Sequence, residues 1–546
     1  MTPTPQHDLI IRRGAIFDGS GEAAFEGDLA IDGDKIVAVG GEIKGRGREE
    51  IDAAGLAVAP GFINILSWAA EALIEDGRSQ SDIRQGVTLE VMGEGSSMGP
   101  LNANMKEEMK SRQGDIKYDI TWTTLKEFLQ ELVRRGVSPN VASFVGATTV
   151  RVRHLGYADR APTDAELGAM RADVARAMRE GAVGLSSALI YSPASYAGTE
   201  ELIALASEVA AHDGLYISHI RNEGQRLLEA LDEFFTVVRR AAVRAEIYHF
   251  KAAGLANWHL LEKAIAHIER ARGEGLDISA DMYTYAASST GLDAVMPGWV
   301  QEGGQVAWRK RLQDPEIRAR VRAEMESADV AWENMFAATG PDRMLLVGFR
   351  NEALRHLIGR TLADVAAERG ASPAETAMDL VVEDESRVQV VYHSMSEENV
   401  QRKIRLPWMS FGSDARSLAP EGVFLRSSTH PRAYGTFARL LGRYVRDEGL
   451  IPLEEAIRRL TSFPALRLCL DRRGSLAPGH HADVVIFDTQ TIQDHATFES
   501  PHHYSTGVRD VLVNGVPVLR DGEHNGALPG KVVTGPGSRK RSARRV

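Results

Sequence analysis

The middle of the chain alternates short apolar segments with helical segments, and this alternation constrains the fold more than any other feature. One helical stretch opens with the capping box Thr163-x-x-Glu166, and another starts at Thr199. Eight strands that alternate with helices predict an α/β fold of the (β/α)8 TIM-like barrel type. The eight candidate strands are GFIN (61–64), TLEVMG (88–93), VASFVG (141–146), AVGLSS (182–187), YISHI (216–220), EIYHF (246–250), DISADMY (277–283) and WMSFGSD (408–414).

The two ends of the chain differ from the middle, because both consist of short apolar runs broken by Gly and Asp turns. We expect them to form one small β-sandwich around an inserted barrel. The stretch between Tyr285 and Ser410 is too long for one crossover, which predicts an inserted helical lid subdomain at the barrel mouth. The predicted divisions are 1–58 and 471–530 for the sandwich, 59–470 for the barrel, about 291–345 for the insertion, and 531–546 for a basic, solvated tail.

Composition excludes several classes of protein. The net charge of −11 disfavours nucleic acid as a partner, and the single cysteine, Cys469, excludes an internal disulfide and a cysteine-cluster metal site. The sequence starts without a basic, apolar leader and has no run of about 18 apolar residues. We therefore expect a cytoplasmic protein without a membrane partner. Association into a homo-oligomer stays open.

Residues able to bind a metal follow several of the predicted strands. Strand five ends in His219, strand six in His249 followed by Lys251, strand eight in Asp414, and strand two is followed by Glu94. The carboxyl ends of barrel strands meet at one mouth, where active sites lie. Imidazole nitrogens and carboxylate oxygens are normal ligands of a catalytic zinc, which keeps one position open for water. These residues predict a zinc site at the mouth. A single histidine at a strand end, taken alone, is more often a hydrogen-bonded core residue.

Several longer segments carry a resemblance. They are APGFIN (59–64), GLSSALIYSPASYAGTEEL (184–202), YISHIRNEG (216–224), YHFKAAG (248–254), ADMYTYAASSTGL (280–292), FGSDA (411–415), HPRAYGTFARLLGRYVR (430–446) and GSLAPGHHADVVIFD (474–488). With these segments the chain resembles the N-acyl-D-amino-acid deacylase (D-aminoacylase) family of the amidohydrolase superfamily over nearly its whole length. The last segment is common across the superfamily, whereas YAASSTGL and HPRAYGTF are particular to this branch.

The resemblance implies a zinc-dependent hydrolase that converts an N-acyl-D-amino acid into a carboxylic acid and a free D-amino acid. It implies that His219 and His249 hold the tightly bound zinc. It also implies that Asp414 is the general base and acid, which takes a proton from a metal-activated water and returns it to the leaving amine.

The sequence departs from the family pattern at three places. The His-x-His of the first strand is replaced by Leu66 and Trp68, which cannot bind a metal, so we expect one zinc per chain. The turn Gly-Asn-Cys-Gly is replaced by Gly-Glu-Gly-Ser, and we predict that Glu94 is the third ligand in place of the cysteine. The alternative is that Glu94 is a solvent-exposed loop carboxylate or an ion-pair partner. Ala147 stands where a Gly-His-Gly turn usually has its histidine.

Two cations are candidates for binding the carboxylate of the substrate, namely Lys251 and Arg432. Hydroxyl contacts are predicted from Tyr191, Tyr283, Ser288 and Ser289. Each of these has a structural alternative, as a core residue or a surface charge. The acyl group and the amino-acid side chain stay open. Two other functions also stay open, namely a hydrolase of another amide (a cyclic amide, N-carbamoyl compound or D-peptide) and a non-catalytic protein that binds a small ligand.

Overall fold

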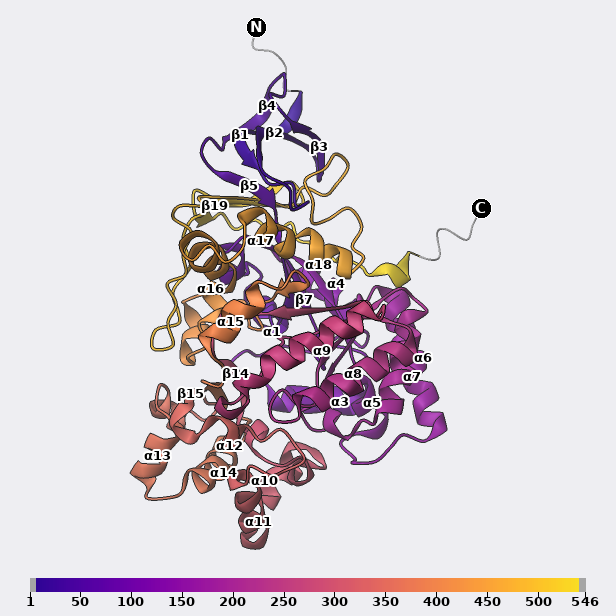
Figure 1. Ribbon diagram of the computed structural model, residues 1–546, viewed down its shortest axis with the longest axis vertical. Helices are drawn as coiled ribbons and strands as arrows, with labels where there is room; N and C mark the ends of the chain where they lie inside the picture. Colours follow the sequence, from indigo (N-terminus) through magenta and orange to yellow (C-terminus); the bar gives the residue numbers. More distant parts are fainter. Residues whose placement is uncertain (1–5, 540–546) are drawn as a thin grey trace.

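The computed structural model describes residues 6–539, and its largest sheet draws on both ends of the chain. This sheet has nine strands in the order β21-β20-β19-β18-β5-β1-β2-β3, with β4 paired to β1. The two ends meet where β5 (Ala57–Pro60) pairs antiparallel with β18 (Val484–Phe487). Figure 1 shows this sheet at the top of the molecule. The other strands are β1 (His7–Ile16), β2 (Phe25–Asp32), β3 (Lys35–Gly40), β4 (Gly47–Asp52), β19 (Val508–Val513), β20 (Val516–Arg520) and β21 (Glu523–His524).

Every strand predicted in the middle of the chain is present, in two parallel sheets. One sheet has the order β6-β7-β8 and the other β17-β13-β12-β11-β10-β9. The two sheets are continuous along the chain, because β9 follows one residue after β8. At the other seam the Asp414 N–H donates to the carbonyl of Leu66 over 2.9 Å. The strands are β6 (Phe62–Ser67), β7 (Val87–Met92), β8 (Asn140–Ser143), β9 (Val145–Gly146), β10 (Gly184–Ala188), β11 (Leu215–His219), β12 (Arg244–Ile247), β13 (Ile278–Met282) and β17 (Met409–Phe411).

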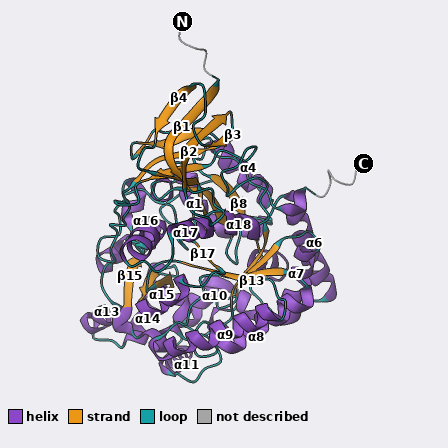
Figure 2. Cartoon of the chain, turned by 45° about the horizontal axis from the view of Figure 1, so that its top comes forward, coloured by secondary structure: helices purple, strands orange, loops and turns teal. Residues whose placement is uncertain are grey.

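Helices cover the outer face of these strands. The predicted capping box is present, since the Thr163 hydroxyl accepts from the Glu166 N–H and starts α6 (Asp164–Glu180). Helix α7 (Thr199–Ala210) buries Leu202, Leu205 and Val209, as its periodicity predicts. Figure 2 shows α6 to α9 on the outer side of β13. The remaining helices around the strands are α1 (Ala70–Glu75), α2 (Gln80–Ile83), α3 (Ala103–Arg112), α4 (Leu125–Arg135), α5 (Ala147–Leu155), α8 (Leu227–Ala241), α9 (Leu261–Gly273), α15 (Glu397–Ile404), α16 (Arg432–Arg439), α17 (Leu453–Leu460) and α18 (Ser462–Arg467).

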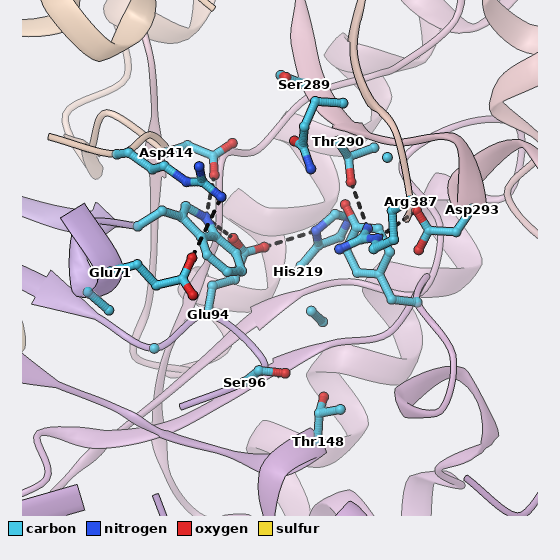
Figure 3. A pocket seen from close by; sticks show the side chains of 18 of the residues that line it. Glu71, Glu94, Ser96, Thr148, His219, Ser289, Thr290, Asp293, Arg387 and Asp414 are labelled. Carbon is cyan, nitrogen blue, oxygen red and sulfur yellow. Dashed lines mark hydrogen bonds and ion pairs between the residues drawn. The ribbon is translucent and has the colours of Figure 1, made fainter. Parts of the chain in front are cut away.

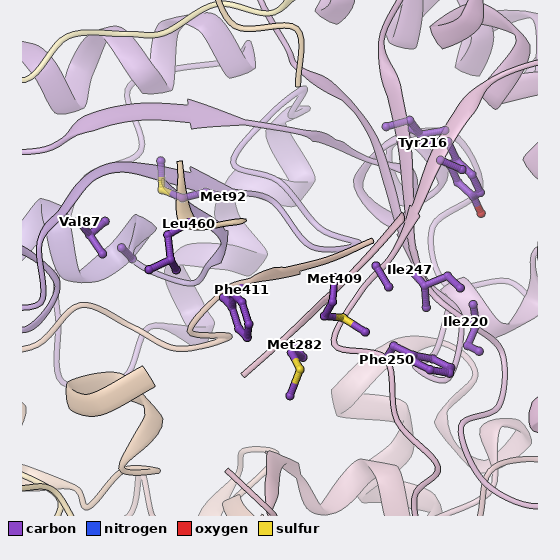
Figure 4. Close-up of a cluster of buried hydrophobic side chains, with 14 of the residues drawn as sticks. Val87, Met92, Tyr216, Ile220, Ile247, Phe250, Met282, Met409, Phe411 and Leu460 are labelled. Atoms are coloured by element: carbon purple, nitrogen blue, oxygen red, sulfur yellow. The ribbon is translucent and has the colours of Figure 1, made fainter. Parts of the chain in front are cut away.

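The parallel strands are buried on both faces. In β11, Tyr216 belongs to the large cluster between strands and helices, whereas its neighbour Ile217 belongs to a separate inner cluster. Figure 4 shows part of the large cluster, where Met282, Met409 and Phe411 from two adjacent strands lie together. These strands are buried along nearly their whole length, and this includes polar residues such as Glu90, Glu246 and Asp281.

The segment between β13 and β17 has a hydrophobic cluster of its own, formed by residues from Leu292 to Tyr392. It lies at the end of the molecule opposite the nine-stranded sheet (Figure 1). The segment contains helices, as expected, and also a three-stranded antiparallel sheet in the order β14-β16-β15. Its elements are β14 (Ser288–Gly291), α10 (Gly304–Arg311), α11 (Pro315–Glu326), α12 (Met335–Thr339), β15 (Met344–Gly348), α13 (Leu362–Arg369), α14 (Pro373–Asp384) and β16 (Gln389–Tyr392).

The described part of the C-terminal stretch packs against the parallel strands. The Val533 N–H donates to the Val141 carbonyl over 2.9 Å, and the Gly535 N–H donates to the Gly181 carbonyl over 2.9 Å. Residues 540–546 of the predicted basic tail lie outside the described residues. None of the helices between residues 6 and 539 has the length and apolar character needed to cross a bilayer.

Candidate active site

A tight turn after β7 carries Glu94 between two glycines that no other residue could replace without strain. Gly93 has φ +101°, and a Cβ there would lie 2.6 Å from the Phe144 carbonyl oxygen. Gly95 has φ +59°, and a Cβ there would lie 2.5 Å from the Cβ of Ala188. Positive φ and close backbone approach are the two conditions that favour glycine. The turn therefore fixes the backbone of Glu94, which is only 5% exposed.

Two histidines converge on the Glu94 carboxylate. His219, the last residue of β11, places Nδ1 3.1 Å from Glu94 Oε1. His249, two residues after β12, places Nε2 3.1 Å from the same oxygen. Figure 3 shows Glu94 joined to His219 across the site. His249 has a φ of +33°, an unfavourable conformation of the kind that clusters at functional sites. The Glu94 carboxylate thus contacts a ring nitrogen of each histidine and is not exposed to solvent.

This donor set fits a zinc ion. Zinc binds imidazole nitrogen at about 2.0–2.1 Å and carboxylate oxygen at similar range, so tetrahedral ligand atoms lie roughly 3.3 Å apart. The ligand atoms that Glu94, His219 and His249 offer all lie within 4.8 Å of one another, and both His–Glu separations above are 3.1 Å. All three side chains are buried, and three protein ligands leave the fourth position for water or substrate.

A second carboxylate, Glu223, lies against the same histidines and was missed by the sequence reasoning. Its Oε1 is 3.1 Å from His249 Nδ1, and its Oε2 is 3.4 Å from His219 Nε2. Lys251 Nζ lies 2.6 Å from both oxygens. The predicted substrate cation Lys251 thus already pairs with Glu223. The available signal was the position of Glu223 four residues after His219, in the YISHIRNEG segment.

The charges in this cluster keep both carboxylates ionised. Burial on its own would raise the pKa of Glu94. The positive charges of His249 and His219, together with their hydrogen bonds to the carboxylate, outweigh burial and hold that pKa well below its usual range. Burial is likewise outweighed at Glu223 by Lys251 and the histidines, which lower its pKa. Burial favours neutral His219, yet Glu223 and Glu94 raise the pKa of His219 to about 10.

Asp414 follows β17 and pairs with the other predicted substrate cation. Its Oδ2 lies 2.7 Å from Arg432 Nη1, and both side chains are nearly buried. Asp414 has a φ of +48°, so it shares with His249 a strained backbone at the mouth. Burial raises the pKa of Asp414, which the charge of Arg432 only partly offsets. The Arg432 guanidinium also stacks 4.4 Å over the Tyr283 ring.

Trp68 connects the group of Glu94, His219 and His249 to Asp414. Its indole N–H points to Glu94 Oε2 at 3.1 Å and to Asp414 Oδ1 at 3.0 Å. The sequence showed this position only as the loss of a metal ligand. No feature of the sequence indicated that the replacing side chain would donate to both carboxylates.

One cavity of about 600 Å³ connects these groups. Every predicted site residue lines it, namely Glu94, His219, His249, Lys251, Asp414, Arg432, Tyr191, Tyr283, Ser288 and Ser289. Among the hydroxyl groups, Ser289 donates to the Val390 carbonyl over 2.9 Å, and the Tyr191 ring packs edge-on against His219. Ala147 starts α5, and the cavity wall there is formed by the next two residues, both threonines.

The cavity also contains an arginine that the sequence reasoning missed. Arg387, just before β16, forms an ion pair of 2.7 Å with Asp293 and lies over the Tyr191 ring. Figure 3 shows this pair on the opposite side of His219 from Asp414. Arg387 comes from the inserted segment, which the sequence predicted only as a helical lid, so no strand end pointed to this residue.

Comparisons with known proteins agree with this geometry. Residues 49–519 match the model of the amidohydrolase family. The chain is 32% identical to the D-aminoacylase of Alcaligenes xylosoxydans xylosoxydans, over 96% of this chain and 97% of that protein. The chain therefore belongs to the amidohydrolase family.

Several solved structures match almost the whole chain, among them the following two. One is a D-aminoacylase structure that describes a binuclear metal centre, with activation by one metal and attenuation by the second. It superposes with a TM-score of 0.80 at 32% identity, covering 97% of this chain and 100% of that one. N-acyl-D-glutamate deacylase from Bordetella bronchiseptica, complexed with zinc and a phosphonate inhibitor, superposes with a TM-score of 0.79 at 29% identity, covering 97% and 99%. These are enzymes to which the chain is similar.

Proposed function

We propose that this chain is a zinc-dependent amidohydrolase that cleaves N-acyl-D-amino acids into a carboxylic acid and a free D-amino acid. The observation that carries the proposal is the buried group Glu94, His219 and His249, with Asp414 beside it in one cavity. The relatives named D-aminoacylase and N-acyl-D-glutamate deacylase support the substrate class. One zinc ion per chain is part of the proposal.

The proposed scaffold is a closed (β/α)8 barrel. Two observations support closure, namely the continuity of β8 with β9 and the backbone hydrogen bond from Asp414 to Leu66 at the other seam. We propose 59–470 as the barrel, 1–58 with 471–530 as the β unit, and the inserted unit as a lid that extends past residue 345. The continuous hydrophobic cluster from Leu292 to Tyr392 supports that longer extent.

The residues of the chain divide the reaction between them. A bound zinc supplies a Lewis acid that lowers the pKa of water from 15.7 to about 7. Asp414 is placed to accept a proton from the attacking water and to return it to the leaving nitrogen. Its raised pKa suits the second step, because the protonated form is then more easily reached. Arg432 holds the Asp414 carboxylate in place through their ion pair.

Substrate positioning falls to the rest of the cavity wall. Arg432 and Lys251 each pair with a carboxylate of the chain, at 2.7 and 2.6 Å. A substrate carboxylate would therefore share these cations with Asp414 and Glu223, which places it next to the reacting groups. Tyr191, Tyr283, Ser288 and Ser289 supply the hydroxyl groups of the same wall.

The test combines metal analysis with a chiral substrate panel. We expect elemental analysis of protein purified without added metal or chelator to give about one zinc per chain. We expect N-acetyl-D-amino acids to be hydrolysed, with their L-enantiomers as matched controls. Hydrolysis of cyclic amides, N-carbamoyl compounds or D-peptides in place of the acetyl panel would reassign the substrate. Protein that binds no zinc and hydrolyses none of these would contradict the enzyme proposal and favour a ligand-binding protein.

A further inference from the structure

The indole N–H of Trp68 lies within hydrogen-bond distance of two carboxylates of the site, those of Glu94 and Asp414. An indole has one N–H and no acceptor, so the same proton is shared between Glu94 Oε2 at 3.1 Å and Asp414 Oδ1 at 3.0 Å. Trp68 is 43% exposed, so one part of the ring faces the open cavity while the N–H is turned to the carboxylates. The side chain is anchored at the end of β6, where its backbone N–H donates to the Ala415 carbonyl over 2.9 Å.

Two carboxylates that approach one point repel each other unless a positive group or a donor lies between them. A second metal ion is one such group, and the similar D-aminoacylase structure is described with a binuclear centre. In this chain the point between Glu94 and Asp414 already carries the Trp68 N–H. Neither Trp68 nor Leu66, its neighbour two residues back on β6, offers a ligand atom.

We propose that the Trp68 N–H takes the place of a second cation, limits the site to one metal ion, and positions the two carboxylates for that ion and for proton transfer. This inference rests on the proposed function.

The two oxygens of Glu94 show how this positioning works. Oε1 faces His219 and His249, whereas Oε2 is held by Trp68. The hydrogen bond to Oε2 leaves Oε1 as the oxygen directed to the metal, with the carboxylate plane fixed. Partners of this kind behind a metal ligand typically change metal affinity by 10- to 100-fold when they are lost. Trp68 is thus a positioning residue that acts through Glu94 and Asp414.

The test compares Trp68→Phe, which removes the N–H and keeps a ring, with Trp68→His, which adds a ligand atom. Trp299→Phe is the matched control, because its indole N–H also donates to a carboxylate, that of Glu324 at 3.1 Å, in the inserted segment. The readouts are zinc stoichiometry after equilibration with excess zinc, zinc Kd by chelator competition, and the visible absorption spectrum of the cobalt-substituted proteins.

We expect wild type and Trp299→Phe to hold one zinc with the same Kd and the same cobalt spectrum. We expect Trp68→Phe to bind zinc on the order of 10-fold or more weakly, with a changed cobalt spectrum. We expect Trp68→His to take up more than one zinc equivalent at excess zinc. If Trp68→Phe does not fold, the stoichiometry of Trp68→His alone decides.

Three results would overturn the inference. The first is a second zinc in wild type. The second is a Trp68→Phe protein with wild-type Kd and cobalt spectrum. The third is a folded Trp68→His protein that stays at one equivalent. If wild type binds zinc and hydrolyses N-acyl-D-amino acids while any of these results is found, the proposed reaction stands and the role of Trp68 fails. A second zinc in wild type would also end the one-zinc part of the proposed function. A wild type that binds no zinc ends both.

Discussion

Two of the buried carboxylate clusters in the described part of the chain have different kinds of partner, cations in one and neutral hydrogen-bond donors in the other. At the mouth, Glu94 and Glu223 face His219, His249 and Lys251. The other cluster, formed by Asp82 and Glu90, lies beside β6 and β7. Both clusters are buried to a similar degree, so burial does not distinguish them. The difference lies in what the carboxylates touch.

The second cluster pairs Asp82 and Glu90 with neutral donors. Asn64 Nδ2 lies 3.2 Å from Asp82 Oδ1 and 3.1 Å from Glu90 Oε2, and the Ser79 hydroxyl donates to Glu90 Oε1 over 3.0 Å. Burial raises the pKa of Glu90 to about 7. Burial, together with the charge of Glu90, raises the pKa of Asp82 well above its usual value.

This comparison shows that partner type, and not burial, decides the ionisation of these groups. Cations lower the pKa of a buried carboxylate, whereas neutral donors compensate burial only in part. The two carboxylates of the first cluster, Glu94 and Glu223, stay ionised and suited to a metal ion. The inner cluster retains a proton near neutral pH and ties β6 and β7 together by hydrogen bonds. Four predictions test this division, in order of decreasing effect.

The largest effect is expected from Glu94→Ala. Removing one of the three proposed metal ligands should reduce zinc content from about one per chain to near zero. It should also lower kcat/KM on the order of 10³-fold or more, since water without a metal ion regains its pKa of 15.7. The same outcome is expected for His219→Ala. His212→Ala is the control, because His212 lies just before the other end of β11 and bonds the Glu208 carbonyl. Unchanged zinc content in Glu94→Ala would show that Glu94 is only an ion-pair partner.

Asp414→Asn should separate proton transfer from metal binding. We expect zinc content to be retained and kcat to fall by about 10²- to 10⁴-fold, the usual range for a lost general base or acid. Asp494→Asn is the matched control, because Asp494 pairs with Arg439 at 3.0 Å as Asp414 pairs with Arg432. An Asp414→Asn protein with wild-type kcat would remove Asp414 from the chemistry.

Glu90→Gln should change the pH dependence of stability. The pKa of Glu90 rises from the ordinary 4.5 to about 7 on folding, so the folded state binds more protons between these values. The contribution of Glu90 to wild-type stability therefore falls as the pH rises from about 4.5 to about 7, by up to roughly 3 kcal/mol at 1.36 kcal/mol per pH unit. The amide cannot ionise, so Glu90→Gln should lack most of this fall.

The measurement for Glu90→Gln is urea unfolding at pH 5 and pH 8. Relative to wild type, the variant should gain stability at pH 8 more than at pH 5. The exposed Glu107→Gln variant should show the same pH difference as wild type. Parallel curves for Glu90→Gln and wild type would mean that Asp82 carries the shared proton at all these pH values.

The two clusters also show what the sequence could and could not predict. The eight strands and their order could be predicted from apolar runs and helix caps, because the residues that form each buried strand are adjacent in the sequence. We could identify His219, His249 and Asp414 because the active-site residues of such barrels lie at the carboxyl ends of the strands. The partners Glu223 and Arg387 were missed, because pairing across the mouth depends on side-chain directions that no local pattern records.

The inner cluster was missed for a different reason. Asn64 and Glu90 lie on predicted strands and Asp82 lies between these strands in the chain, and a polar residue there has no visible partner until the strands are packed. Trp68 was seen only as a substitution that removed a ligand. Its hydrogen bonds to Glu94 and Asp414 required coordinates. The insertion lacked a strong pattern, because its sheet is formed by short strands far apart in sequence.

The smallest effect is expected from Ser79→Ala, which removes one neutral donor from the inner cluster. A hydrogen bond to a neutral group contributes about 1 kcal/mol and one to a charged group about 1.5–3 kcal/mol. The Ser79 hydroxyl donates to Glu90, so its loss should cost about 1 kcal/mol at pH 5, where Glu90 is protonated, and about 2 kcal/mol at pH 8.

Ser79 has a φ of +53°, and any backbone effect of the substitution is the same at both pH values. The difference between the two pH values therefore isolates the hydrogen bond. Surface Ser111→Ala, whose hydroxyl bonds the Glu108 carbonyl, should show no such difference. An equal cost of Ser79→Ala at pH 5 and pH 8 would mean that Glu90 does not change charge between them, and the contrast between the two clusters would then rest on the mouth alone.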